Sequence, residues 1–216
     1  MRRAIIPFLV LALTAALATA AFADDQEKAT KEIKKISAIS VDSNMRSIVN
    51  RTTADMLKAG RLDLVKERQS LNLNYGELFL LHQLTGGGAK MEDLAAQLKA
   101  GKTIFDLAND NHANWKQIAS DGKKLNKRID ENIEKYFVDG KKQAALDKTD
   151  QYDAKADRVA ADSNLSKDEY SDAQNRYQHL YELATSQLPT GNANVQNQGQ
   201  GNSTPAIAPP MASGKH

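Results

Sequence analysis

The chain has 216 residues, with 29 basic and 27 acidic side chains and no cysteine. The lack of cysteine excludes disulfides, iron–sulfur clusters, thiolate zinc sites and cysteine nucleophiles. A net charge of +2 does not provide the strong positive field that nucleic-acid binding needs, so we expect no nucleic-acid partner.

Residues 1–23 have the pattern of a secretory signal peptide that is removed by cleavage. Arg2 and Arg3 form a basic start, an apolar run follows, and Ala21-Phe22-Ala23 supplies the small-x-small site before Asp24. Cleavage between Ala23 and Asp24 removes both arginines, which leaves the mature chain formally neutral. No later apolar run is long enough to span a bilayer. We therefore expect a periplasmic or secreted protein with no stable membrane anchor after cleavage.

The placement of proline and glycine predicts an all-α domain over residues 24–188. This stretch contains no proline, which costs about 3 kcal/mol inside a helix. Its glycines fall mainly where helices are expected to end, and the Gly86-Gly87-Gly88 run predicts a flexible joint near 86–88. We expect an irregular multi-helix bundle.

Apolar residues at three- and four-residue spacing divide this domain into helices. In chain order the predicted helices cover residues 26–37, 42–60, 62–69, 75–85, 91–100, 103–109, 115–138 and 166–188, with a weaker signal over 141–162. The segment 75–85 is apolar on nearly every side, which predicts the central core element. Asn74 and Asn114 are predicted N-caps, and capping boxes are predicted at Thr103–Asp106 and Ser166–Glu169.

The segment 189–216 differs in composition from the rest of the chain. It begins at Pro189 and consists mostly of Asn, Gln, Gly, Ser and Pro, with few apolar residues. Such a segment cannot bury enough apolar surface to fold, so a disordered low-complexity tail is predicted.

The sequence partly matches several motifs of enzymes and metal sites, but each match lacks a residue or a spacing that the motif requires. Gly101-Lys102-Thr103 lacks the earlier glycine of a phosphate-binding loop, because Ala96 occupies that position. The stretch ending in Glu169 matches half of a calcium loop, but Arg158 stands at the first ligand position. The four histidines have no metal-ligand spacing. We therefore expect no metal, no cofactor and no enzymatic activity.

Two stretches resemble known groups of proteins. Residues 99–118 (KAGKTIFDLANDNHANWKQI) resemble the middle of a LysM module, which implies binding of peptidoglycan or chitin. A LysM module also needs a strand on each side of this stretch, whereas here both flanks are predicted to be helical. Together with residues 71–81, the same stretch resembles uncharacterised exported helical bacterial proteins, which implies no activity.

Four aromatic residues are candidates for a binding surface. Tyr170, Tyr177 and Tyr181 share one face of the last predicted helix, and either a partner or the bundle itself could cover them. Trp115 begins an apolar helix face, where a packing role competes with partner binding. The leading hypothesis is an exported non-enzymatic protein that acts by protein–protein contacts in the cell envelope, as a scaffold, adaptor or chaperone-like binder. The alternatives are peptidoglycan binding through residues 99–118 and an exported enzyme of unrecognised type.

Overall fold

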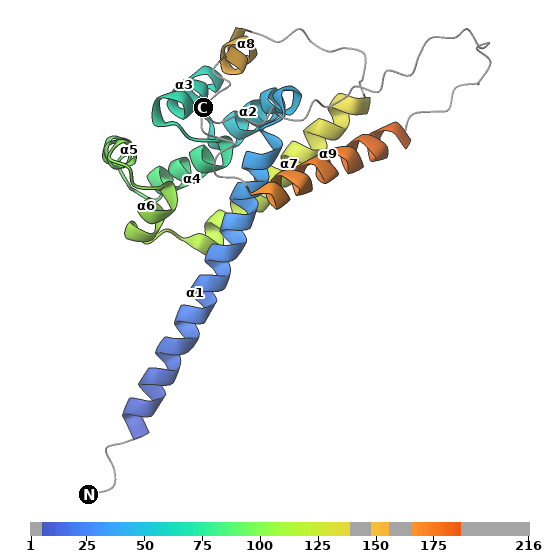
Figure 1. Cartoon of the computed structure of the whole chain (residues 1–216). Coiled ribbons are helices and arrows are strands. Elements are labelled where there is room, and N and C mark those ends of the chain that lie inside the picture. The colour runs from blue at the N-terminus through green and yellow to red at the C-terminus, as the bar shows by residue number, and fades with distance from the viewer. Residues whose placement is uncertain (1–5, 139–147, 156–165, 187–216) are drawn as a thin grey trace, which may run out of the picture.

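The computed structural model of the chain describes residues 6–138, 148–155 and 166–186 (Figure 1). All regular structure in these ranges is α-helical, which confirms the predicted all-α multi-helix fold. The helices are α1 (Ile6–Ile39), α2 (Ser43–Leu57), α3 (Arg61–Leu71), α4 (Tyr75–Gly86), α5 (Met91–Lys99), α6 (Ile104–Asp110), α7 (Trp115–Val138), α8 (Lys148–Lys155) and α9 (Lys167–Ser186). The predicted tail, 189–216, lies outside the described residues.

Helix α4 is the centre of the core, as its continuous apolar sequence predicts. Its largest fully buried side chains are Tyr75 and Phe79. Asn74 begins the helix with a full capping box, in which its side chain accepts a hydrogen bond from the Glu77 amide and the Glu77 carboxylate accepts one from the Asn74 amide. Each fully buried Leu or Phe of α4 contributes roughly 1.5–3 kcal/mol. The helix therefore holds its neighbours mainly by apolar burial.

Helix α1 lies against α7, α4 and α9, and α7 also contacts α2 and α9 (Figure 1). The buried side chains of α1 include Ala29, Ile33 and Ile36. On α7, Gly122 stands where α1 approaches closely, because a Cβ added there would lie 3.0 Å from the Cβ of Glu32. A glycine inside a long helix is unfavourable by itself, and here it lets two helices pack tightly.

The turn after α4 corresponds to the predicted joint at 86–88. Backbone hydrogen bonds from Gly87, Gly88 and Ala89 back to the last turn of α4 close it, and Gly88 has a φ of 105°. This φ suits glycine and few other residues. The structure thus shows a hydrogen-bonded turn at this point, and its flexibility stays a prediction.

Candidate functional site

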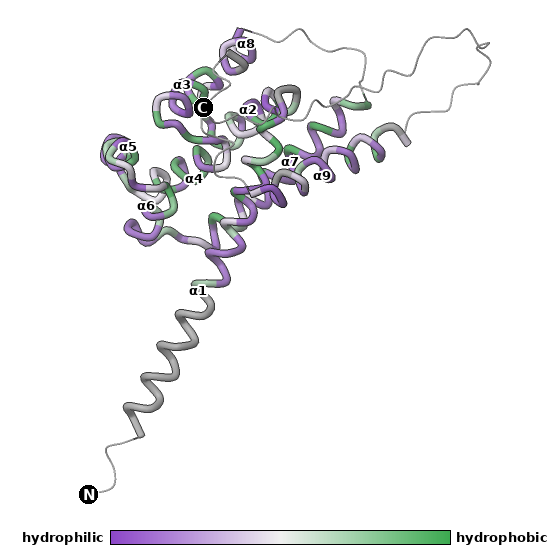
Figure 2. The backbone as a smooth tube through the Cα atoms, in the orientation of Figure 1, coloured by the Kyte–Doolittle hydropathy of each residue, from purple (hydrophilic) through white to green (hydrophobic). Residues whose placement is uncertain are grey.

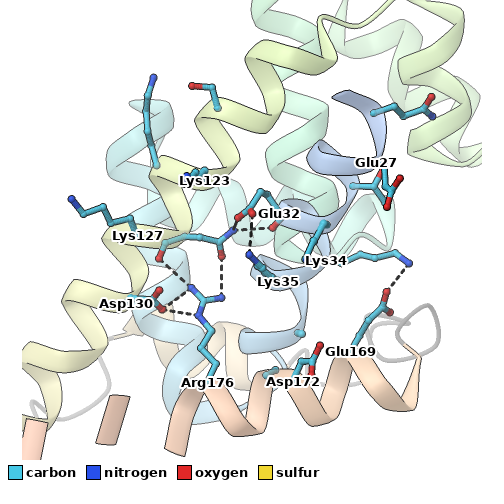
Figure 3. A pocket seen from close by; sticks show the side chains of 18 of the residues that line it. Glu27, Glu32, Lys34, Lys35, Lys123, Lys127, Asp130, Glu169, Asp172 and Arg176 are labelled. Carbon is cyan, nitrogen blue, oxygen red and sulfur yellow. Dashed lines mark hydrogen bonds and ion pairs between the residues drawn. The ribbon is translucent and has the colours of Figure 1, made fainter. Parts of the chain in front are cut away.

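Helices α1, α7 and α9 enclose a groove of about 1240 Å³ (Figure 3). Twelve of its 19 lining residues are charged, seven basic and five acidic, and we call this hollow the charged groove. The stretch where α9 crosses the other two helices is mostly hydrophilic (Figure 2). Its volume exceeds that of most small-molecule sites, and most of its lining residues are charged, whereas hydrophobic and aromatic residues usually line such sites. The charged groove therefore suits a polypeptide better than a small ligand.

A hydrogen-bond network at one end of the groove fixes the three helices to one another. The amide nitrogen of Asn126 on α7 donates to the Glu32 carboxylate of α1, at 2.8 Å. From α9, the Arg176 guanidinium donates to the Asn126 side chain at 3.1 Å and to Asp130 at 2.7 Å. Burial raises the pKa of Asp130, and the charge of Arg176 offsets this only in part. These charges are therefore engaged in structure rather than free for a ligand.

The walls of the groove differ in charge. Figure 3 shows Lys123 and Lys127 on α7 and the acidic Glu169 and Asp172 on α9. Lys34 of α1 bridges to Glu169 at 2.7 Å. No ion-pair partner is found in the described part of the chain for Lys123, whose side chain is exposed. A partner can therefore meet one basic and one acidic wall.

The Lys34–Glu169 ion pair predicts how the stability of the folded chain depends on pH. Burial alone would raise the pKa of Glu169, but hydrogen bonds from Lys34 and from the Ser166 amide outweigh it, so the pKa lies below its ordinary value. A carboxylate with a lowered folded pKa contributes stability above its unfolded pKa, and this is lost as the pH falls through the folded pKa. We expect Glu169→Gln to lower the melting temperature at neutral pH, and the difference to shrink as the pH falls below 4.5.

The control for this prediction is Glu131→Gln. Glu131 is also a carboxylate near a lysine, at 3.8 Å from Lys127, but both belong to α7 and their side chains are well exposed. An exposed pair of this kind contributes little, so its removal should be nearly neutral at every pH. Equal losses for the two variants, or a Glu169→Gln loss that persists in acid, would contradict the role given to the α1–α9 pair.

Next to the charged groove, the same two helices α7 and α9 carry an aromatic cluster, formed by Tyr136, Phe137, Tyr177 and Tyr181. The Phe137 ring packs edge-on against Tyr177 and Tyr181, with ring centroids 5.2 Å apart in both cases. Tyr177 and Tyr181 thus share one face of α9, as predicted, and Tyr181 remains 45% exposed. Tyr170 belongs to α9, but its side chain lies outside the described residues.

Trp115 must be corrected as a candidate for the binding surface. It is 1% exposed and packs within the core, at the first turn of α7. Its apolar position at the start of an amphipathic helix turns the ring inward, so it cannot contact a partner in this fold. The indole nitrogen has no hydrogen-bond partner in the described residues, a cost that the buried ring area offsets.

The segment 99–118 folds as two helices between helical flanks. Helix α5 precedes Gly101 and α7 runs on to Val138, so the described residues place helices where a LysM module has its two strands. The predicted Thr103–Asp106 capping box is present. No family model, curated protein or solved structure matches the chain. The likeness to LysM thus rests on sequence alone.

Three side chains of types that active sites use, Glu77, His82 and Asp106, are each engaged in contacts within the domain. Glu77 and Asp106 serve in capping boxes, and His82 contacts Glu67 at 2.7 Å. None of these residues lines the charged groove. Over the described ranges, no group of three or more metal-ligating side chains comes together, and no helix is both long and apolar enough to cross a membrane.

Proposed function

We propose that this chain is an exported, non-enzymatic helical protein that binds another protein in the cell envelope. The contact surface is the α7–α9 face, which we define as the charged groove together with the aromatic cluster. The observation that carries the proposal is the continuity of the two. Ala173 of the groove lies four residues before Tyr177 on α9, and Asp130 lies seven residues before Phe137 on α7, so each helix carries both features on one face. A partly exposed aromatic centre beside a polar margin is typical of protein interfaces.

The charge pattern indicates what kind of partner fits. A polyanion would meet Glu169 and Asp172 as well as the lysines, and the repulsion would weaken its binding. A polypeptide can place acidic side chains near Lys123 and Lys127 and basic ones near α9. Tyr181 would then anchor an apolar side chain of that polypeptide. The proposed partner is therefore a protein segment with both signs of charge, and the role is that of an adaptor or scaffold.

The burial of α1 supports the export part of the proposal. Ala23 and Asp24, the residues on either side of the predicted cleavage site, are both exposed. Among the side chains of α1 that the structure describes, from residue 23 onward, the first buried one is that of Ala29. Cleavage at this point would leave the buried side chains from Ala29 to Ile39 in place on the domain. The mature chain should therefore begin at Asp24 and fold after transport.

The test is in-situ photo-crosslinking of the exported chain. A photoreactive residue replaces Tyr181, and in a matched control it replaces Tyr152 of α8, which is 44% exposed. We expect reproducible capture of one protein at position 181 and not at 152, by a chain that begins at Asp24. Capture should fall when Lys123 and Lys127 are both changed to Glu. Equal capture at both positions, or adducts of peptidoglycan fragments, would contradict the proposal.

A further inference from the structure

In the described part of the short helix α8, two aspartates are buried against the domain. Among its described side chains, 148–153, only Asp150 and Asp153 are buried, at 7% and 3% exposure, while Tyr152 faces solvent. Residues three apart on a helix share a face, so both carboxylates enter the domain together. Because no apolar side chain in this range is buried, α8 is held by polar contacts.

These carboxylates enter a site that we call the arginine pocket, formed by Asn50, Arg51, Arg61, Arg68 and Tyr75. Asp153 pairs with Arg68 and accepts a hydrogen bond from the Tyr75 hydroxyl at 2.7 Å. Asp150 pairs with Arg61, and Arg51 lies 3.8 Å from its other oxygen. The Asn50 amide donates to the Tyr75 oxygen at 3.0 Å, which holds the hydroxyl toward Asp153.

One buried donor of the arginine pocket has no partner in the described part of the chain, although two carboxylates of α8 enter the pocket. Three guanidinium groups, of Arg51, Arg61 and Arg68, face the two carboxylates. The Arg68 side chain is only 4% exposed, and its guanidinium carbon lies 5.1 Å from the centre of the Tyr75 ring. The Nε atom of Arg68 is buried and has no hydrogen-bond partner in the described part of the chain. A pocket of this kind is costly to leave without an anion. It therefore favours an occupant that carries carboxylates.

The contacts that hold α8 are of a kind that allows this helix to detach while the rest of the domain stays folded. Buried ion pairs repay their desolvation cost only in part, and segments with few buried apolar contacts are the first to detach from a folded domain. Detachment of α8 leaves the apolar core of α1, α4 and α7 in place, because none of the described α8 side chains belongs to it. The domain can thus persist with the arginine pocket open.

We propose that the arginine pocket is a docking site for a helix of a partner protein that carries two aspartates three residues apart, and that α8 occupies it until such a helix replaces it. The chemistry of the occupant follows from the two carboxylates already seated there and from the unpaired Nε donor of Arg68. This site lies on α2, α3 and α4, so it is separate from the α7–α9 face and does not depend on the function proposed for that face.

The test is a nuclear magnetic resonance titration with a synthetic peptide of residues 146–157. In the full chain, Asp150→Asn with Asp153→Asn removes the carboxylates of α8 and leaves the arginine pocket unchanged. We expect the peptide to shift the Arg68 and Tyr75 side-chain resonances of this variant at concentrations at least about tenfold lower than for the unaltered chain. The reason is that the tethered α8 competes at an effective concentration on the order of millimolar.

Two controls make the outcome decisive. A peptide with both aspartates changed to asparagine should produce no shifts, and added sodium chloride should weaken binding of the original peptide. The proposal is overturned if the asparagine peptide shifts the same resonances, or if the original peptide shifts none at millimolar concentration. Should the variant fail to fold, the titration of the unaltered chain to millimolar peptide decides between the same two results.

Discussion

Gly76→Ala is expected to lower the free energy of unfolding by about 3 kcal/mol, because α4 and α1 pack without room for a methyl group at this position. A Cβ on residue 76 would lie 2.1 Å from the backbone oxygen of Ile33 and 2.4 Å from the Ser37 hydroxyl. The backbone oxygen cannot rotate away, so α4 must move off α1. That shift would also disturb the hydrogen bond from Ser37 to Asn74, which caps α4. Chemical denaturation measures the loss directly.

Gly86→Ala is the matched control for this prediction. Gly86 is the last residue of the same helix and is exposed, and no atom lies within 4 Å of a Cβ added there. The substitution should change stability by no more than about 0.5 kcal/mol, with a slight gain expected from the reduced freedom of the unfolded chain. If the two alanine variants lose the same stability, the close approach of α1 and α4 is wrong.

Trp115→Ala is expected to cost about 3–5 kcal/mol, the range seen when a large buried aromatic ring is removed. Trp115 is the largest of the fully buried side chains, and its loss leaves a cavity at the corner where α6 leads into α7. Thermal or chemical unfolding followed by circular dichroism detects this loss without relying on the tryptophan signal.

The stability loss of Trp115→Ala is to be compared with that of Tyr181→Ala. Tyr181 contacts Phe137 but remains partly exposed, so its removal should destabilise the fold by only about 1 kcal/mol. The stability loss should therefore be large at Trp115 and small at Tyr181. A Trp115→Ala protein of unchanged stability that no longer captures a partner would restore Trp115 to the binding surface and overturn its placement in the core.

The elements with strong local signals could be predicted from the sequence. Helix α7 has an apolar stripe at helical spacing, and α4 is apolar throughout, so burial determines both. The caps at Asn74, Thr103 and Ser166 follow from residue chemistry at fixed spacing, and all three are present. At these places the local preferences of the residues agree with the packing of the whole domain, so these helices and caps can be predicted from a single sequence.

The start of α1 and the charged groove were less accessible to sequence reasoning. The sequence predicts a first helix that begins near residue 26, whereas α1 starts at Ile6. No helix breaker follows Pro7, and proline is tolerated in the first turn of a helix. The charged groove depends on three helices distant in sequence. Charged residues such as Lys123 and Glu169 look like ordinary solvated positions until those helices are placed together.

The sequence indicates the charged face of each helix at the α8 contact, but not that these two faces meet. Asp150 and Asp153 are three apart, and Arg61 and Arg68 are seven apart, so each pair lies on one face of its own helix. The ion pairs join residues 89 and 85 positions apart, and nothing local indicates that these two faces meet. Long-range pairing of charges follows from the packing of the helices, which a single sequence does not reveal.

The binding function of the α7–α9 face is tested most directly by the affinity of the purified chain for the protein captured at position 181. Tyr181→Ala should weaken that binding by about tenfold or more, as expected when an aromatic residue at the centre of an interface is truncated. Tyr152→Ala removes an equally exposed ring from α8 and should change the affinity by less than about twofold, as for residues outside the centre of an interface. Equal effects of the two substitutions, or no effect of either, would contradict the placement of the interface on the α7–α9 face.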